Sequence, residues 1–467
     1  MHHVAVALGC IACLCTLAHA EPKPADARPA DPRAALDPLA KSLIDGEYCV
    51  GIVVGLISRS APPRVLAWGE TVRGNHKQPD GNTVFEIGSV TKVFTSLLLA
   101  EAVVDKQVTL DTPVASLLPA KAKLPAGKRP ITLLDLATHT SGLPRLPDNM
   151  HPADTANPYA DYTTDQLYSF LAGMKLDREP GARYEYSNLG AGLLGHALAL
   201  RGKTDWPTLV AAQITKPLAM TSTMVALTPD AKARFAQAYD ADGEPVKPWD
   251  LPALAGAGAL RSTANDLMLL LRAELAAARE PRTRLAQAMA LTQKPQHDLS
   301  DAAKGKIGLA WHIEPDGTLW HNGGTGGFHS FVAVDPKRQL AVVVLANGSA
   351  SQIDDLGNAA VNAAAGEPVP PSFKLPPPDM PVDEKTLESY VGKYPLAPTF
   401  VVEISHSGGK LFAQPTGQPR IRLHATSTRD FAIHIVPASV TFEVDAKGKV
   451  TGLVLHQGGQ DQRAPRQ

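Results

Sequence analysis

A serine and a lysine three residues apart, Ser89 and Lys92, are the best candidates for nucleophilic chemistry in this chain. Ser89 follows Gly88 and stands directly before an apolar run, residues 93–104, that predicts a buried helix. A serine at a helix N-terminus faces free amides and the positive end of the helix dipole. A lysine in an apolar site has a lowered pKa and can accept the serine proton. The pair predicts attack by Ser89 with Lys92 as the base.

The serine–lysine spacing alone also fits a helix cap followed by a lysine that extends to the surface. The same spacing recurs at Ser407 and Lys410, where two intervening glycines predict a polar hairpin turn. Other groups must therefore support the pair before a catalytic site can be predicted.

A phenol and an amide two residues apart, Tyr186 and Asn188, precede an apolar helical run over residues 193–200. A tyrosine beside a cationic lysine can be partly ionised and serve as an acid or a base. An asparagine amide can hold both the lysine and a substrate carbonyl. A helix cap and a core tyrosine are the structural alternatives.

A glycine-rich segment, HNGGTGGF (321–328), begins with His321 and leads into a strand-like run. Its glycines, Gly323 and Gly324 among them, allow a substrate backbone to lie close to the strand, and the amides there can face an oxyanion. A hairpin turn is the alternative. The three motifs in this order predict one common site more strongly than any of them does alone.

The elements that must position these groups are strands at both ends of a helical middle. Strands are predicted over residues 50–57, 64–68, 308–313, 328–334 and 340–345, and a final helix over 353–365. No parallel strand–helix–strand alternation is present. The pattern predicts an α+β fold, an α/β sandwich whose single sheet is flanked by helices, with an inserted helical subdomain.

Two proline-rich segments divide the chain. Residues 21–35 predict an extended leader, and residues 367–383, with seven prolines in seventeen positions, predict a linker, because proline removes amide donors and fixes φ. Residues 36–366 between them form the predicted catalytic domain. Residues 384–467 alternate apolar and polar side chains between turns and predict a small C-terminal all-β, barrel-like domain.

Residues 1–20 predict a signal peptide. An apolar run over 4–17, too short for a permanent membrane span, precedes a small-x-small cleavage pattern at Ala18 and Ala20. An N-terminal core helix is the alternative. Cleavage removes three of the four cysteines and leaves Cys49, which predicts no intramolecular disulfide and a buried apolar role for this thiol. We expect an exported protein, periplasmic or secreted.

Composition favours a globular protein that acts on small molecules. The 467 residues carry 45 basic and 46 acidic side chains, a balance that gives no electrostatic footprint for nucleic acid. The sequence contains no Gly-x-Ser-x-Gly elbow and no His-Glu-x-x-His zinc motif. We predict no metal, no cofactor, no nucleic-acid partner and a monomer, and we interpret His139 as structural.

The motifs Ser-x-x-Lys, Tyr-x-Asn and His/Lys-x-Gly, in this order, resemble those of the active-site-serine penicillin-recognising enzymes. The surrounding sequence is similar to the class C β-lactamases, the D-Ala-D-Ala carboxypeptidases and the β-lactamase-like esterases. The supporting segments are FEIGSVTKVFTSLLLAE, LLDLATHTSGLPRLP, YSNLGAGLLGHAL, GALRSTANDLMLLL and HNGGTGGFHSFVAV. The resemblance covers about residues 36–366 and implies an antiparallel, β-lactamase/transpeptidase-like sheet. The tail from about residue 384 resembles a small β-barrel appended to some of these hydrolases.

The resemblance implies catalytic roles for three residues. Ser89 would be the nucleophile that the substrate amide acylates, and Lys92 would be the base for acylation. Tyr186 would share proton transfer to the leaving group and later activate water.

The resemblance also implies binding roles. Asn188 would bind the substrate amide, and His321 would line the opposite wall and contact the substrate carboxylate. Backbone N–H groups of Ser89 and Gly324, next to Gly323, would form the oxyanion hole.

Two positions depart from the class C pattern. Those enzymes usually carry lysine where this chain has His321, and a neutral histidine gives up a charge-assisted hydrogen bond of roughly 1.5–3 kcal/mol to the carboxylate. Thr91 stands where serine or alanine is commoner. The histidine, with SVTK and YSN, is more similar to the carboxypeptidase and esterase relatives.

The first predicted function is an exported serine hydrolase, a class C-like β-lactamase that opens the β-lactam amide through an acyl-enzyme on Ser89. The alternatives are a D-Ala-D-Ala carboxypeptidase or peptidase acting on cell-wall peptides, and an esterase or D-amino-acid amidase. These enzymes share acylation and differ in the fate of the acyl-enzyme. A non-enzymatic penicillin sensor or envelope protein predicts no turnover that depends on Ser89.

Overall fold

The computed structural model describes residues 31–467 except 60, 300–304, 376–378, 398–399, 417–419 and 434–437. The predicted signal peptide and residues 21–30 of the predicted leader lie outside the described residues. Helix α1 (Pro32–Asp45) begins inside the segment predicted as an extended leader. The Asp31 side chain accepts a hydrogen bond from the backbone N–H of Arg33, and Pro32 suits the first helical position, so the helix starts here.

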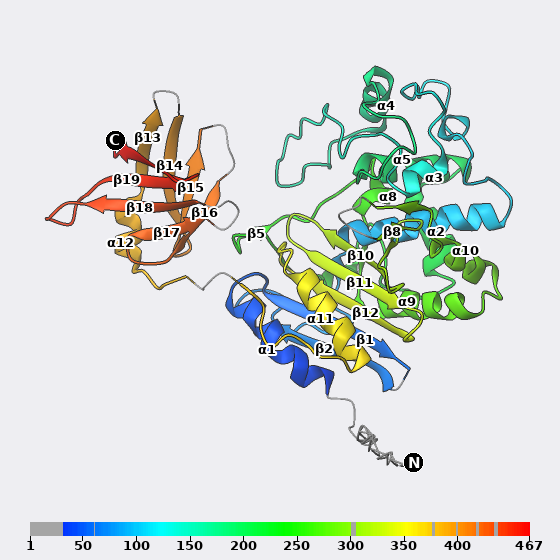
Figure 1. Ribbon diagram of the computed structural model, residues 1–467, viewed down its shortest axis with the longest axis horizontal. Coiled ribbons are helices and arrows are strands. Elements are labelled where there is room, and N and C mark those ends of the chain that lie inside the picture. Colours follow the sequence, from blue (N-terminus) through cyan, green and yellow to red (C-terminus); the bar gives the residue numbers. More distant parts are fainter. Residues whose placement is uncertain are drawn as a thin grey trace, which may run out of the picture.

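Within the described residues, eight antiparallel strands form the main sheet in the order β2-β1-β12-β11-β10-β9-β8-β7 (Figure 1). The strands are β1 (Gly51–Ser58), β2 (Ala61–Gly69), β7 (His297–Asp298), β8 (Lys306–Ile307), β9 (His312–Ile313), β10 (Leu319–Gly324), β11 (His329–Asp335) and β12 (Leu340–Ala346). Strands β1 and β12, from the two ends of the domain, pair directly. The predicted antiparallel sheet is confirmed.

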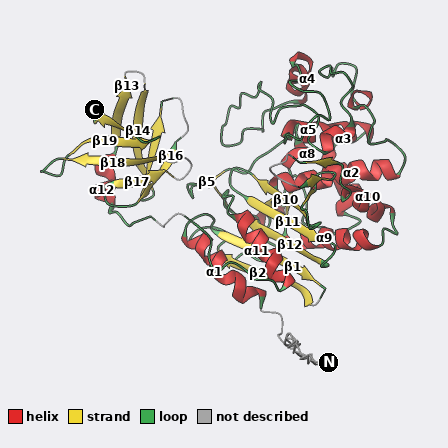
Figure 2. Cartoon of the chain, in the orientation of Figure 1, coloured by secondary structure: helices red, strands yellow, loops and turns green. Residues whose placement is uncertain are grey.

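Helices cover both faces of this sheet (Figure 2). Helices α1 and α11 (Ile353–Ala365) lie on one face, and α9 (Ala264–Arg279) packs on the other against β1 and β12. Alternate residues of β12 therefore enter two different cores, which explains its continuous apolar sequence. Cys49 is a buried member of the core beneath α1 and α11, as predicted.

The helical subdomain lies between β2 and β7 in the sequence. Its helices are α2 (Thr91–Val104), α3 (Leu133–Ala137), α4 (Thr164–Gly173), α5 (Asn188–Arg201), α6 (Trp206–Val210), α7 (Pro229–Ala233), α8 (Ala255–Gly258), α9 and α10 (Arg284–Thr292). Short strand pairs join β3 (Phe85–Glu86) to β6 (Arg261–Ser262), and β4 (Ala238–Tyr239) to β5 (Pro245–Val246). Helix α2 is buried over most of its length, as its apolar sequence predicts. No helix in the described part of the chain is long and apolar enough to cross a membrane.

The single strand predicted over residues 308–313 is wrong. Strands β8 and β9 are instead the arms of a tight hairpin, in which the Gly308 N–H donates to the Trp311 carbonyl at 2.7 Å. Ala310 takes a left-handed φ of +68° in the turn. Leu309 and Trp311 belong to this turn and are fully buried, so the apolar sequence of the segment resembles that of a strand.

The C-terminal domain begins with the short helix α12 (Glu384–Tyr390). The strands that follow are β13 (Gly392–Ala397), β14 (Phe400–Ser407), β15 (Lys410–Pro415), β16 (Ile421–Ala425), β17 (Asp430–Ile433), β18 (Ala438–Val444), β19 (Val450–Gln457) and β20 (Gln460–Pro465). Each pairs antiparallel with the next, and the Gln467 N–H donates to the Lys393 carbonyl at 2.9 Å. The result is the predicted barrel, nearly closed.

Ser407 and Lys410 flank the β14–β15 turn, and the predicted hairpin is confirmed. Gly408 and Gly409 take φ values of +57° and +74° there, which residues with a Cβ adopt rarely. Lys410 Nζ reaches Glu47 Oε2 of the catalytic domain at 2.8 Å.

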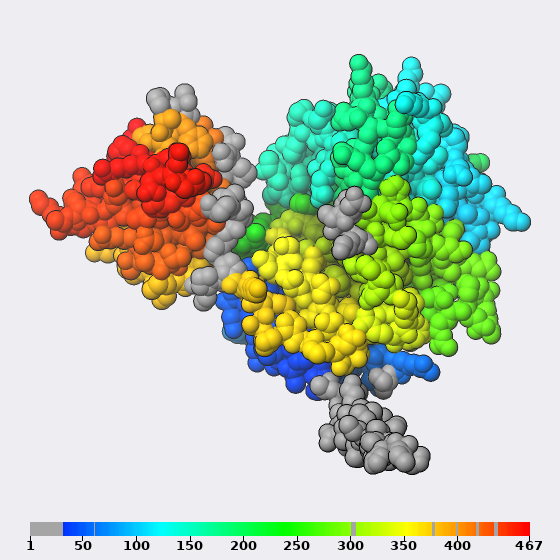
Figure 3. All heavy atoms as spheres, in the orientation of Figure 1, coloured from blue at the N-terminus to red at the C-terminus, as the bar shows by residue number. Residues whose placement is uncertain are grey.

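An ionic cluster connects the two domains, which lie side by side in Figure 3. Arg422 of the barrel lies 2.8 Å from Glu47 Oε2 and 2.9 Å from Asp379 Oδ2. The described residues of the predicted linker, 367–383, form neither helix nor strand.

Candidate active site

Ser89 lies in a single 3₁₀ turn, Gly88–Val90, between β3 and α2. Gly88 takes a φ of +46°, and a Cβ on it would lie 2.8 Å from the backbone nitrogen of Gly324. Glycine is therefore required for β10 to approach the turn this closely. The Ser330 hydroxyl donates to the Ile87 carbonyl at 2.8 Å and connects the turn to β11.

Lys92 follows in the first turn of α2, and its side chain is buried at 1% exposure. Its Nζ lies 2.9 Å from Ser89 Oγ, 2.8 Å from Asn188 Oδ1 and 2.7 Å from the Ala257 carbonyl oxygen. Burial, and then the charge of Arg145, lower the pKa of Lys92 well below 10.5. The last two oxygens can only accept, so a neutral amine donates to both and turns its lone pair toward the Ser89 hydroxyl.

Tyr186 lies beside the pair formed by Ser89 and Lys92. Its ring centroid is 4.9 Å from Lys92 Nζ, and the Ser89 side chain beside it acts to lower the pKa of its phenol. Burial raises the pKa of Tyr186 to about 12. The phenol is therefore neutral near pH 7, and the interpretation of a partly ionised tyrosine is wrong, because burial raises its pKa by more than Ser89 and Arg145 lower it.

Two buried histidines flank Tyr186. His139 stacks on its ring with centroids 4.4 Å apart, and His139 Nδ1 accepts the Ser187 N–H at 3.1 Å. His321 Nδ1 donates to the Asn322 carbonyl at 2.6 Å, whereas its Nε2 is buried without a hydrogen-bond partner in the described chain. Burial lowers the pKa of both imidazoles well below 6.5, so both are neutral.

His321 is fully enclosed in this structure, with an exposed fraction of 0%. Its ring centroid lies 6.5 Å from that of Tyr186. The predicted contact between His321 and a substrate carboxylate stays a prediction.

The end of β10 lies against the turn that carries Ser89. A Cβ on Gly323 would lie 2.8 Å from the Ser89 backbone nitrogen and closer still to the Ile87 carbonyl oxygen. A Cβ on Gly324 would have no neighbour nearer than 3.8 Å. The tertiary structure therefore brings all seven predicted site residues together around the serine, while their roles stay predictions.

Three groups at the site were missed or underestimated from sequence. The Ala257 carbonyl holds Lys92 and leaves no side-chain signal. His139, interpreted as structural, supports the Tyr186 ring directly. The Arg145 guanidinium carbon lies 5.1 Å from the Tyr186 ring centroid. The sequence feature that could have revealed Arg145 is its position beside Pro144, in the segment 133–147 that carries the resemblance.

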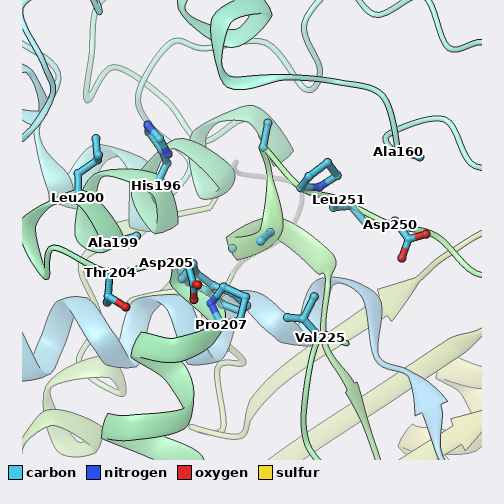
Figure 4. A pocket seen from close by; sticks show the side chains of 15 residues that line it. Ala160, His196, Ala199, Leu200, Thr204, Asp205, Pro207, Val225, Asp250 and Leu251 are labelled. Atoms are coloured by element: carbon cyan, nitrogen blue, oxygen red, sulfur yellow. The ribbon is translucent and has the colours of Figure 1, made fainter. Parts of the chain in front are cut away.

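Two cavities have linings that do not include Ser89. One, of about 670 Å³, opens between α5, α6 and residues 250–256 and is lined by apolar residues with His196, Thr204, Asp205 and Asp250 (Figure 4). The other, of about 830 Å³, lies between the two domains beside Glu47 and Arg422. In the part of the chain that the structure describes, no three His, Cys, Asp or Glu side chains are grouped to hold a metal ion.

Known protein families match both parts of the chain. A family model described as Beta-lactamase matches residues 40–366, and one described as a domain of unknown function (DUF3471) matches residues 376–465. The chain is 30% identical over 331 residues to the D-alanyl-D-alanine-carboxypeptidase/endopeptidase AmpH of Escherichia coli (strain K12), covering 67% of this chain and 83% of that protein. It is 26% identical to a Beta-lactamase of Pseudomonas fluorescens, covering 68% of this chain and 94% of that protein.

Solved structures show the same fold. A Beta-lactamase/D-alanine Carboxypeptidase from Yersinia pestis, complexed with citrate, has a TM-score of 0.63 and 26% identity, covering 72% of this chain and 97% of that one. A class C beta-lactamase has a TM-score of 0.63 at 21% identity, covering 72% and 98%. The predicted fold class is confirmed.

Proposed function

Because the chain belongs to the beta-lactamase family, we propose that it is a serine hydrolase that opens the β-lactam amide through an acyl-enzyme on Ser89. The observation that carries the proposal is the 2.9 Å approach of Ser89 Oγ to the buried Nζ of Lys92. A neutral amine at this distance is a base for the hydroxyl proton.

Acylation begins when Lys92 takes the Ser89 proton and Oγ attacks the lactam carbonyl carbon. The carbonyl oxygen becomes an oxyanion, which the backbone N–H groups of Ser89 and Gly324 stabilise by hydrogen bonds. Asn188 holds the Lys92 amine through its Oδ1, leaving its amide nitrogen for the substrate carbonyl.

The C–N bond of the lactam then breaks, and its nitrogen takes a proton. Tyr186 suits this step because its phenol is neutral and lies beside the Ser89 side chain. A water molecule next attacks the ester carbonyl, gives a proton to the Lys92–Tyr186 pair and releases the ring-opened acid while the Ser89 hydroxyl is restored. The proton that the nitrogen receives comes from Ser89 through Lys92 and Tyr186, and a proton from the water molecule replaces it on Ser89.

A D-alanyl-D-alanine carboxypeptidase is the second candidate. The 30% identity to the Escherichia coli carboxypeptidase/endopeptidase favours it, and so does His321 at the position where class C enzymes usually carry lysine. Both candidates use the same acylation step, and they differ in how fast water reaches the acyl-enzyme. Export to the periplasm, or secretion, is part of the proposal for either activity.

Purified protein mixed with a penicillin should gain the mass of one penicillin and lose it again as ring-opened acid is released. Intact-protein mass against time, with assay of the acid, measures both steps, and Ser89→Ala is the control that gains no mass. A long-lived adduct would show that deacylation is slow and would favour the carboxypeptidase over the β-lactamase. No adduct and no product would contradict both candidates and favour an esterase or a dead site.

The rate of acylation should fall at acid pH and show no titration at 10.5, the ordinary lysine value. Since the pKa of Lys92 is lowered, the amine is already neutral well below that pH, and the rate is lost only as pH falls through the lowered pKa and a proton occupies the lone pair. Because the pKa of Tyr186 is about 12, ionisation of its phenol should not change the acylation rate near neutral pH.

Rapid-mixing acylation by an uncharged nitrophenyl ester measures this profile, because the substrate does not titrate. The Tyr186→Phe variant should react more slowly, but its acylation rate should show the same loss at acid pH. A rate that keeps rising up to about pH 10 would show an ordinary lysine and contradict the prediction.

A further inference from the structure

The third motif offers the substrate no positive charge. His321 is enclosed and neutral, with its Nδ1 committed to a backbone carbonyl. The Asn322 amide donates to Asp354 Oδ2 at 2.6 Å, because alternate strand residues point to opposite faces. A carboxylate that enters this site must therefore find its counter-charge elsewhere.

Arg145 supplies a charge at the site. Its side chain is exposed, and its guanidinium carbon lies 5.1 Å from the Tyr186 ring centroid, while Lys92 Nζ lies 4.9 Å from the same centroid. The field of Arg145 lowers the pKa of Lys92, and it opposes the rise that burial causes in the pKa of Tyr186. Arg145 therefore places an exposed positive charge beside the group formed by Ser89, Lys92 and Tyr186.

The backbone of Arg145 is held in place by the turn that carries Tyr186. The Ser187 hydroxyl donates to the Pro144 carbonyl at 2.6 Å. The backbone N–H groups of Asn188 and Leu189 both donate to the Arg145 carbonyl, at 3.0 and 3.2 Å. The guanidinium therefore extends from a fixed backbone beside the catalytic phenol.

No carboxylate of the described residues pairs with Arg145, whereas other arginines of this region are paired. Arg183 Nη2 lies 3.2 Å from Glu185 Oε2, and Arg261 Nη2 lies 3.2 Å from Glu86 Oε1. An unpaired, planar guanidinium at a reaction site is suited to bidentate binding of a carboxylate.

We propose that Arg145 binds a carboxylate of the substrate and makes the site selective for anionic β-lactams or peptides over neutral ones. This inference rests on the proposed function and names the substrate class of the same site. The carboxylate belongs either to the leaving-group side, as in every penicillin and every free peptide C-terminus, or to the acyl side chain. The two sources present the same chemistry to the guanidinium.

A penicillin and its methyl ester form the matched pair that tests the proposal, since they differ only in the leaving-side charge. Arg145→Ala should lower kcat/KM for the penicillin about 10- to 100-fold, mainly through KM, and change the methyl ester by less than about threefold. Arg145→Lys should recover part of the preference. Arg183→Ala, which removes a paired arginine, should leave the ratio unchanged.

A penicillin with a second carboxylate on its acyl side chain distinguishes the two sources. If Arg145→Ala lowers kcat/KM for this compound alone, Arg145 binds the carboxylate on the acyl side. If kcat/KM falls for every penicillin, Arg145 binds the carboxylate on the leaving side. For a carboxypeptidase, a D-alanyl-D-alanine peptide and its C-terminal amide replace the first pair.

An unchanged preference for the charged substrate in Arg145→Ala, together with no selective loss for the penicillin that carries the acyl-side carboxylate, would overturn the inference. Equal losses for both members of a pair would also overturn it, because Arg145 would then act only through Lys92 and Tyr186. If wild-type protein forms neither a Ser89 adduct nor a product with any substrate, the proposed function itself fails. Circular dichroism shows that each variant is folded.

Discussion

Ser89→Ala, Lys92→Met and the double variant should each lose about 10⁴- to 10⁶-fold in kcat, and the double variant should be no slower than either single one. The serine cannot attack without losing its proton, and the lysine has no function without the serine, so the two residues act as one unit. Residual turnover comes from the oxyanion hole and from binding. Methionine replaces lysine because it fills the same buried space without an amine.

Steady-state hydrolysis of a penicillin measures this loss, and circular dichroism with thermal unfolding shows that the fold persists. The Ser89 hydroxyl is small and the Lys92 stem is replaced by a similar volume, so we expect folded proteins. A Lys92→Met variant within about tenfold of wild type would show that another group takes the serine proton. Multiplicative losses in the double variant would contradict the single-unit mechanism.

Gly323→Ala should lower the acylation rate about 10²- to 10³-fold, the cost of losing one oxyanion donor. The added Cβ would lie 2.8 Å from the Ser89 backbone nitrogen and even closer to the Ile87 carbonyl oxygen. These are backbone atoms that cannot rotate away, so β10 must move from the nucleophile turn. The N–H of Gly324 moves with it and no longer meets the oxyanion.

Gly324→Ala is the matched control. Its Cβ would have no neighbour nearer than 3.8 Å, an ordinary van der Waals distance, and its φ is not left-handed. This variant should stay within about tenfold of wild type, since its backbone N–H is retained. Rapid-mixing acylation by the uncharged ester measures both variants. Equal effects of the two substitutions would show that β10 does not provide the oxyanion donor.

Much of the fold and of the site could be predicted because the signals are local. Three-residue spacing on a helix start places Lys92 beside Ser89, whatever the rest of the chain does. Continuous apolar runs predicted β1, β12 and α2, and all three are buried as expected. The prediction of a single strand over residues 308–313 was wrong because a hairpin can bury its turn residues. The apolar sequence of such a turn then resembles that of a buried strand.

The ionisation and accessibility of the site were decided by tertiary structure. Burial by segments far apart in the chain lowers the pKa of Lys92, raises that of Tyr186 and encloses His321. Long-range packing also brings Arg145 to Tyr186 and the Ala257 carbonyl to Lys92. The sequence by itself therefore predicted the seven residues that gather around Ser89, because the spacing within each motif is local. Only the tertiary structure decided their charges and exposure, because desolvation and electric fields sum over neighbours that no local pattern contains.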